Sequence, residues 1–386
     1  MEFTLPMFLM VLAAAVGGIV ARIIKLPPIL GYIVSGLIFG LIVPESVKNI
    51  VKVTEIGTIL LLFSIGLELS LNQIIKFFRI AVFGALAQMI LVTAIAFFVL
   101  VKLDFDSISA AILSAGFSLS STALVLKILG DRGELESIHG RVMTGWLLAQ
   151  DLAVAPIMVI LPLLGNSTNL ATELSTALLK AGIVVGLAIL AGRSFVPFLI
   201  HKIALTNSRE ILVVSSVAIA LGVAVLTYFL GISPALGAFL AGMVISETQE
   251  NHAVFAEIRP LRDLFVALFF VSLGFLIEPP ILLSNLWLIL LITFGVIFLK
   301  ILVTFLIGFY FNLRGRSAIM NAFGLSQVGE FALVIFSFSR ALNILSSKDT
   351  SIGVAIVLLT LFLSPFLINL ATPVWRKLKN ISSVFS

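Results

Sequence analysis

Long apolar stretches separated by short loops recur along the whole of this chain. Hydrophobic residues make up 60% of its 386 residues and charged residues only 11%, whereas a soluble domain carries about 25% charged residues. Because about 20 apolar residues cross the hydrocarbon core of a bilayer, we expect an all-α integral membrane protein surrounded by lipid. The pattern predicts thirteen spans, at Leu5–Ala21, Pro27–Val43, Ile56–Leu69, Ile80–Val101, Ser107–Leu129, Val142–Leu164, Ala171–Phe195, Ile211–Leu230, Ser233–Ser246, Leu261–Ile277, Ser284–Phe311, Ser317–Ser339 and Ser351–Val374.

The basic residues of the loops predict how these spans are oriented. With the N-terminus outside, seventeen of the 24 lysine and arginine residues fall in inside loops and five in outside loops. This distribution agrees with the positive-inside rule, and an odd number of spans places the C-terminus in the cytoplasm. The charges are scattered through short loops and form no basic stripe, so no nucleic-acid partner is expected.

Two short motifs recur at a nearly constant offset. Pro28–Gly36 is matched 206 residues later by Pro234–Gly242, and Ser64–Gly66 is matched 208 residues later by Ser272–Gly274. Small residues at helix contacts are an alternative source of such matches. The matched motifs lie seven spans apart. Because seven is odd, they cross the membrane in opposite directions, which predicts inverted repeats of the kind typical of secondary transporters. The predicted parts are a first repeat at about 5–164, a linker helix at about 171–195 and a second repeat at about 211–374.

The repeat points to two polar interruptions at corresponding places in predicted spans. Gly116–Ala123 reads GFSLSSTA, and the position 208 residues after Ser121 is Gly329, within Ser326–Phe331, which reads SQVGEF. Broken helices leave N–H and C=O groups unpaired, which is tolerated only around a polar cavity. We therefore expect two broken helices to frame a cation site. Hydroxyls and freed carbonyls at this site are expected from Ser120, Ser121 and Thr122, whose alternative is hydrogen bonding within their own helix.

Asp151 is the acidic residue that most strongly suggests chemistry within the membrane. It follows Gln150 in the middle of a predicted span, where charge is costly and usually functional. Burial disfavours the charged carboxylate and a bound cation favours it, so Asp151 can hold a proton or a monovalent cation in competition. That competition is the chemistry of an antiporter. The alternative is that Asp151 only balances the charge of a lysine.

Lys300 and Glu330 are two further charges inside predicted spans. Lys300 could form a salt bridge with Asp151, neutralise the carbonyl ends of a broken helix, or take part in proton exchange. Glu330 lies at the second interruption, where it could face the cavity or cap a half-helix. Both are expected to compensate charge or couple protons.

Other classes of protein are disfavoured by what the sequence lacks. It has no GxxxxGK[ST] phosphate loop, so ATP-driven transport is not expected within the chain, and no cofactor is predicted. Cysteine is absent, and no paired catalytic acids support an intramembrane enzyme. An anion-coupled symporter would need cationic residues beside the first interruption, and none is close in sequence.

Five segments together resemble the bacterial monovalent cation:proton antiporter-2 family, and within it the Kef-type potassium/proton antiporters. The resemblance covers nearly the whole chain. The segments are Phe117–Leu126, Ala149–Pro156, Gly237–Ile245, Leu268–Gly274 and Gln327–Phe331.

The resemblance implies an Na⁺/H⁺ antiporter-like fold with two unwound helices crossing near the ion site, in a homodimer in the bacterial inner membrane. It implies an elevator-like movement of a core domain, Asp151 as the ion-binding residue and Lys300 as the lysine of the second half. Gln150 stands where electrogenic relatives have a second acid, which implies electroneutral exchange and favours K⁺. A cytoplasmic nucleotide-binding regulatory domain, not present in this chain, is an implied partner.

We therefore expect K⁺/H⁺ exchange in which Asp151 is alternately protonated and cation-bound. Gln150, Ser121 and Thr122 shape the site, and Lys300 stabilises the cation-free carboxylate. Two alternatives remain open. They are Na⁺/H⁺ antiport by the same fold and a channel-like pathway for potassium efflux.

Overall fold

The computed structural model describes residues 4–24, 26–42, 51–68, 82–164, 195–206, 208–229, 234–275 and 277–379. The elements in these ranges are helices, as the sequence predicts. The chain divides into two compact units. Unit 1 comprises Met1–Leu71 and Ala155–Phe275, and unit 2 comprises Asn72–Val154 and Leu276–Ser386. The predicted linker helix at 171–195 lies outside the described residues, apart from its last residue.

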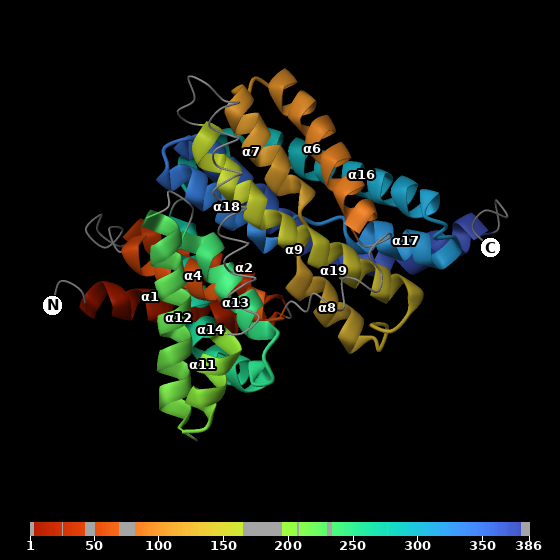
Figure 1. Cartoon of the computed structure of the whole chain (residues 1–386). Helices are drawn as coiled ribbons and strands as arrows, with labels where there is room; N and C mark the ends of the chain where they lie inside the picture. Colours follow the sequence, from red (N-terminus) through yellow and green to blue (C-terminus); the bar gives the residue numbers. More distant parts are fainter. Residues whose placement is uncertain are drawn as a thin grey trace. The chain divides into compact units, whose positions relative to one another are not determined.

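Unit 1 is built around α4, which packs against α13 and α14, while α2 packs against α1 and α14 (Figure 1). Its apolar core contains Phe63, Ala220, Ala238 and Ile245, all 0% exposed. The helices are α1 (Thr4–Ile23), α2 (Pro28–Ile42), α4 (Val51–Glu68), α11 (Phe195–Ala204), α12 (Arg209–Phe229), α13 (Pro234–Ser246) and α14 (Asn251–Phe275).

Glycines of the two matched motifs form close helix contacts within unit 1. A Cβ atom at Gly274 would lie 2.7 Å from the carbonyl carbon of Gly36, and one at Gly242 would lie 3.0 Å from Cα of Gly66. Each position needs glycine because the facing backbones leave no room for a side chain. Under the sequence match, Gly36 corresponds to Gly242 and Gly66 to Gly274. In each contact, a glycine of the first motif from one half of the chain therefore meets a glycine of the second motif from the other half.

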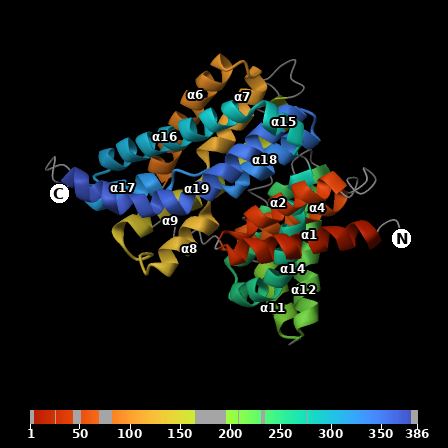
Figure 2. The same ribbon diagram turned by 180° about the vertical axis from the view of Figure 1, so that it is seen from behind.

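Unit 2 holds two pairs of short helices among longer ones. α7 packs against α6 and α18, and α16, α17 and α19 pack against one another (Figure 2). The helices are α6 (Gly84–Lys102), α7 (Ser107–Ser118), α8 (Thr122–Asp131), α9 (Ile138–Leu164, which continues into unit 1), α15 (Pro279–Ser284), α16 (Leu286–Tyr310), α17 (Gly315–Gly324), α18 (Glu330–Ala341) and α19 (Ser347–Lys379).

Six of the helices in the described ranges are long and apolar enough to cross a membrane, namely α1, α6, α9, α12, α16 and α19. α16 shows how such a helix divides its faces. Leu291, Phe294 and Phe298 are each at least 59% exposed, whereas Lys300 and Thr304 are fully buried. An apolar face toward lipid and a polar face toward the protein interior is the arrangement that a membrane imposes on a helix.

Several helices extend beyond the predicted spans. α14 begins at Asn251 rather than Leu261, and α19 runs from Ser347 to Lys379 rather than from Ser351 to Val374. The added turns carry charged residues such as Glu257, Arg376 and Lys377, which lower their hydropathy. A helix keeps its own backbone hydrogen bonds in water as well as in lipid, so hydropathy detects only its apolar part.

Candidate functional site

The first predicted interruption is a gap between two helices. α7 ends at Ser118 and α8 begins at Thr122, and the residues between include Leu119 and Ser121 in extended conformations. Oγ of Ser121 accepts a hydrogen bond from the backbone N–H of Leu124 at 3.3 Å. Ser121 therefore caps α8 at its N-terminus, because serine supplies the acceptor that the first turn of a helix lacks. The predicted span over Ser107–Leu129 consists of two half-helices.

The second predicted interruption separates α17 from α18. α17 ends at Gly324 and α18 begins at Glu330, preceded by Gly329 in an extended conformation. Within the gap, the N–H of Val328 donates to Oγ1 of Thr360 at 3.1 Å. Glu330 is buried in the first turn of α18, where a carboxylate interacts favourably with the N-terminal end of the helix dipole.

The two gaps meet one another. The N–H of Gly329 donates to the carbonyl oxygen of Leu119 at 3.1 Å, and Oγ of Ser120 donates to the carbonyl oxygen of Leu325 at 3.0 Å. A Cβ atom at Gly329 would lie 2.4 Å from the carbonyl oxygen of Ser120. Glycine therefore allows the two extended segments to touch, and backbone groups freed from one helix pair with the other.

Lys300 supplies positive charge where these segments meet. Its Nζ donates to three carbonyl oxygens, those of Ser118 at 3.2 Å, Leu119 at 2.6 Å and Gln327 at 2.8 Å. The first two belong to one interruption and the third to the other. The carbonyl ends of α7 and of the α17–α18 gap carry partial negative charge, which the buried ammonium balances. Lys300 therefore links both interruptions from α16.

Two glutamines hold the first interruption from the side of α6 and α9. Oε1 of Gln150 accepts from the N–H of Ser120 at 2.8 Å, and its Nε2 donates to Oε1 of Gln88 at 2.6 Å. Nε2 of Gln88 in turn donates to the carbonyl oxygen of Ser118 at 3.1 Å. Both side chains are 0% exposed. Gln88 is absent from the residues that the sequence analysis selected, although an amide within the apolar span Ile80–Val101 is itself a signal.

Asp151 lies next to Gln150 on α9 and is 5% exposed. Its Oδ2 accepts a hydrogen bond from Oγ1 of Thr122 at 2.9 Å, which brings the carboxylate to the first residue of α8. Pro156 is inside α9 and has no N–H, so the carbonyl of Leu152 lacks its usual helical donor. A carboxylate and a hydroxyl thus lie in contact beside an interrupted helix, and oxygen atoms of these kinds replace the water around a K⁺ or Na⁺ ion.

The structure therefore brings most of the predicted site residues into one place in unit 2. Gln150 and Asp151 on α9, Ser120 and Thr122 at the first interruption and Lys300 on α16 are joined by the hydrogen bonds above. Ser121 differs, because its hydroxyl caps α8. Thr360, like Gln88, is a contact that is not predicted from the sequence.

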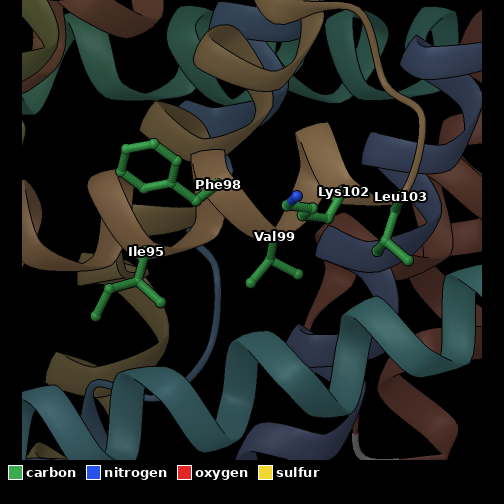
Figure 3. Close-up of a pocket in the computed structure, with 5 residues that line it drawn as sticks. All are labelled: Ile95, Phe98, Val99, Lys102 and Leu103. Carbon is green, nitrogen blue, oxygen red and sulfur yellow. The ribbon is translucent and has the colours of Figure 1, made fainter.

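A surface pocket of about 400 Å³ lies elsewhere in unit 2, at the end of α6 (Figure 3). It is lined by Ile95, Phe98, Val99, Lys102 and Leu103. Apolar side chains cannot replace the water shell of a cation, and the pocket contains none of the predicted site residues. It is therefore separate from the site around Asp151.

Two interrupted helices that meet beside a buried carboxylate are an arrangement that secondary transporters use for binding ions. Residues 11–370 of the chain match the transmembrane family of sodium/hydrogen exchangers. The chain therefore belongs to this family and is a multi-pass membrane protein.

Individual relatives agree with this assignment. The chain is 32% identical over 365 residues to YbaL of Escherichia coli (strain K12), provisionally named a cation/proton antiporter, covering 92% of this chain and 65% of YbaL. It is 34% identical over 375 residues to the chloroplastic K(+) efflux antiporter 3 of Arabidopsis thaliana, covering 90% of this chain and 48% of that protein. These names confirm the Kef-type resemblance, and they describe transporters rather than enzymes. The chain spans about half to two thirds of the length of these relatives.

A solved structure has the same fold. The sodium proton antiporter MjNhaP1 of Methanocaldococcus jannaschii matches with a TM-score of 0.75 and 16% sequence identity, covering 97% of this chain and 100% of that chain. The Na⁺/H⁺ antiporter-like fold that the sequence predicts is thereby confirmed.

Proposed function

We propose that this chain is the membrane domain of a K⁺/H⁺ antiporter in which Asp151 binds a proton and a cation alternately. The observation that carries the proposal is the buried Asp151 carboxylate, which accepts a hydrogen bond from Thr122 at the start of a broken helix. A charged carboxylate is unfavourable at such a place unless a proton or a cation neutralises it. Competition between the two for one carboxylate couples their movements in opposite directions.

We infer exchange of one proton for one cation because Asp151 has a glutamine, and not a second acid, beside it. Gln150 occupies the position next to Asp151, and its amide is committed to Ser120 and Gln88. If only Asp151 changes occupant, the site carries the same net charge with a proton as with a monovalent cation. The proposed exchange is therefore electroneutral.

The identity of the cation rests on the relatives. The name of the Arabidopsis protein, a K(+) efflux antiporter, supports potassium. The name of the family, sodium/hydrogen exchanger, supports the alternative of Na⁺/H⁺ exchange. A channel-like potassium efflux pathway is the other alternative, and it differs in having no obligatory proton movement.

The proposal includes thirteen spans arranged as inverted repeats, with the N-terminus outside and the C-terminus in the cytoplasm. The paired contacts Gly36–Gly274 and Gly66–Gly242 support the repeats, because corresponding motifs exchange partners between them. We further propose elevator-type alternating access, supported by a chain that divides into two compact units with the Asp151 cluster within unit 2. A homodimer and a separate cytoplasmic nucleotide-binding regulatory domain complete the proposal.

An exchange assay tests the function. Proteoliposomes that contain the purified protein and an internal pH-sensitive dye are exposed to K⁺, Na⁺ or Li⁺ at several pH values, with and without a clamped membrane potential. We expect K⁺ to drive proton efflux at a rate that the clamp does not change. Exchange driven only by Na⁺ would replace the ion assignment, and potassium current without proton movement would support the channel alternative.

A further inference from the structure

Four polar side chains in unit 2 are fully buried and have no hydrogen-bond partner for any of their polar side-chain atoms among the residues that the structure describes. They are the hydroxyls of Thr304 and Ser364 and the amides of Asn321 and Gln327. Buried polar groups are almost always hydrogen-bonded, either to protein or to ordered water. A group of such side chains therefore marks a place where water binds.

One of these side chains, Thr304, follows Lys300 along α16, and a second, Asn321 of α17, lies against the same helix. Thr304 lies one helical turn after Lys300, and Gly308 lies one turn further on the same buried face. A Cβ atom at Gly308 would lie 3.8 Å from Nδ2 of Asn321 on α17. Lys300 and Thr304 therefore lie one after the other on one face of α16, and the amide of Asn321, from α17, lies beside the next turn of that face.

The other two lie on the elements that pack against this face. The carbonyl oxygen of Gln327 accepts from Lys300, and the next residue, Val328, donates to Thr360 of α19. Ser364 follows Thr360 by one turn of α19, and both are buried. Because α16, α17 and α19 pack against one another, Thr304, Asn321 and Ser364 lie on helices that are mutual neighbours, and Gln327 lies in the segment that follows α17.

Apolar clusters flank Thr304 on both sides. Val303, which precedes Thr304, belongs to a cluster with Trp146 and Leu147. Phe305, which follows Thr304, packs with Ile319 and Met320 of α17 in a second cluster. A polar side chain between two apolar clusters favours single ordered water molecules over an open cleft.

We propose that Thr304, Asn321, Gln327 and Ser364 bind a chain of ordered water molecules that leads from Lys300 toward the end of α16 at Tyr310. This is the end that the basic loop after α16 predicts to face the cytoplasm. Nζ of Lys300 already donates to three carbonyl oxygens, so this water hydrates the buried polar groups behind the two interruptions and is not itself a proton path to Asp151. The presence of the water does not depend on the proposed antiport.

Radiolytic labelling tests the water chain directly. The protein contains no cysteine, so a single introduced cysteine reports on water at its own position. Thr304→Cys and the matched control Val303→Cys are irradiated in H₂¹⁸O without any ion gradient, and uptake of ¹⁸O at the thiol is measured by mass spectrometry. Because no transport is needed, the result is independent of whether the antiport proposal holds.

We expect Thr304→Cys to take up ¹⁸O several-fold faster than Val303→Cys, although both positions are buried. Adding Asn321→Leu to Thr304→Cys is expected to reduce the uptake, because it removes one of the groups that hold the water. Ser364→Cys, a nearly isosteric change, gives a second report if Thr304→Cys disturbs folding. Uptake at both test positions no faster than at Val303→Cys would show that the region is dry and would overturn the proposal.

Discussion

Gln150 donates a hydrogen bond from its side-chain amide to Oε1 of Gln88 at 2.6 Å, deep within unit 2. Each glutamine then uses its remaining polar atom on the backbone of the first interruption, at Ser120 and at Ser118 respectively. The pair therefore fixes the two sides of the gap between α7 and α8, and neither residue can be replaced by an apolar one without leaving buried polar groups unpaired.

We predict that Gln88→Leu lowers the free energy of unfolding by about 1–3 kcal/mol, the usual effect of leaving a buried polar group without its partner. Exchange activity is expected to fall as well, because the gap loses one of its supports. Met89→Leu, at the neighbouring buried position, is the matched control and should have little effect. Thermal unfolding in detergent compares the two variants. An unchanged stability of Gln88→Leu would contradict the supporting role of the pair.

Lys300→Met should destabilise the protein by about 1.5–3 kcal/mol, the range for hydrogen bonds to charged groups. The change removes the ammonium from three carbonyl oxygens. If these carbonyls are what Lys300 balances, Asp151→Asn will not restore the stability lost. Recovery of stability in the double variant, measured in a double-mutant cycle, would instead assign Lys300 to a salt bridge with Asp151.

Thr122→Val should raise the K⁺ concentration needed for half-maximal exchange about fivefold, because a net hydrogen bond contributes about 1 kcal/mol. Thr122 donates its hydroxyl to Asp151, and valine keeps the shape but not the donor. Thr122→Ser retains the hydroxyl and is expected to behave like the original protein. Equal concentration dependence in the valine and serine variants would exclude Thr122 from the ion site.

Gly329→Ala should disrupt the contact between the two interruptions, since a Cβ atom there would lie 2.4 Å from the carbonyl oxygen of Ser120. Overpacking of this kind typically costs about 1–3 kcal/mol. Gly295→Ala on α16 is the control, because nothing lies within 4 Å of a Cβ atom at that position. Thermal unfolding and exchange rates are measured for both variants. The prediction is wrong if Gly329→Ala is as active and as stable as Gly295→Ala.

The sequence singles out candidate site residues where they break the apolar pattern. Asp151, Lys300 and the polar run around Ser121 stand out because a membrane span otherwise excludes such groups. The interruptions follow for the same reason, and the structure shows a helix ending at each of them.

Other features depend on contacts that a single sequence does not encode. Whether Lys300 contacts Asp151 or the carbonyl oxygens depends on where α16 packs. Gln88 gains its role only when α6 lies beside α9 and α7, so an amide in an apolar span cannot be assigned a partner in advance. The start of α14 at Asn251 is missed because polar turns outside the hydrocarbon continue a helix without any hydropathy signal.

An ion-exchange assay of the Asp151→Asn variant in proteoliposomes tests the central proposal most directly. Asparagine keeps the size of the side chain and can still accept from Thr122, but it cannot bind a proton or neutralise a cation. We predict that cation-driven proton movement, followed with an internal pH-sensitive dye, falls to the level of empty vesicles while the variant remains folded. Exchange at a rate close to that of the original protein would show that Asp151 is not the residue that binds the proton and the cation.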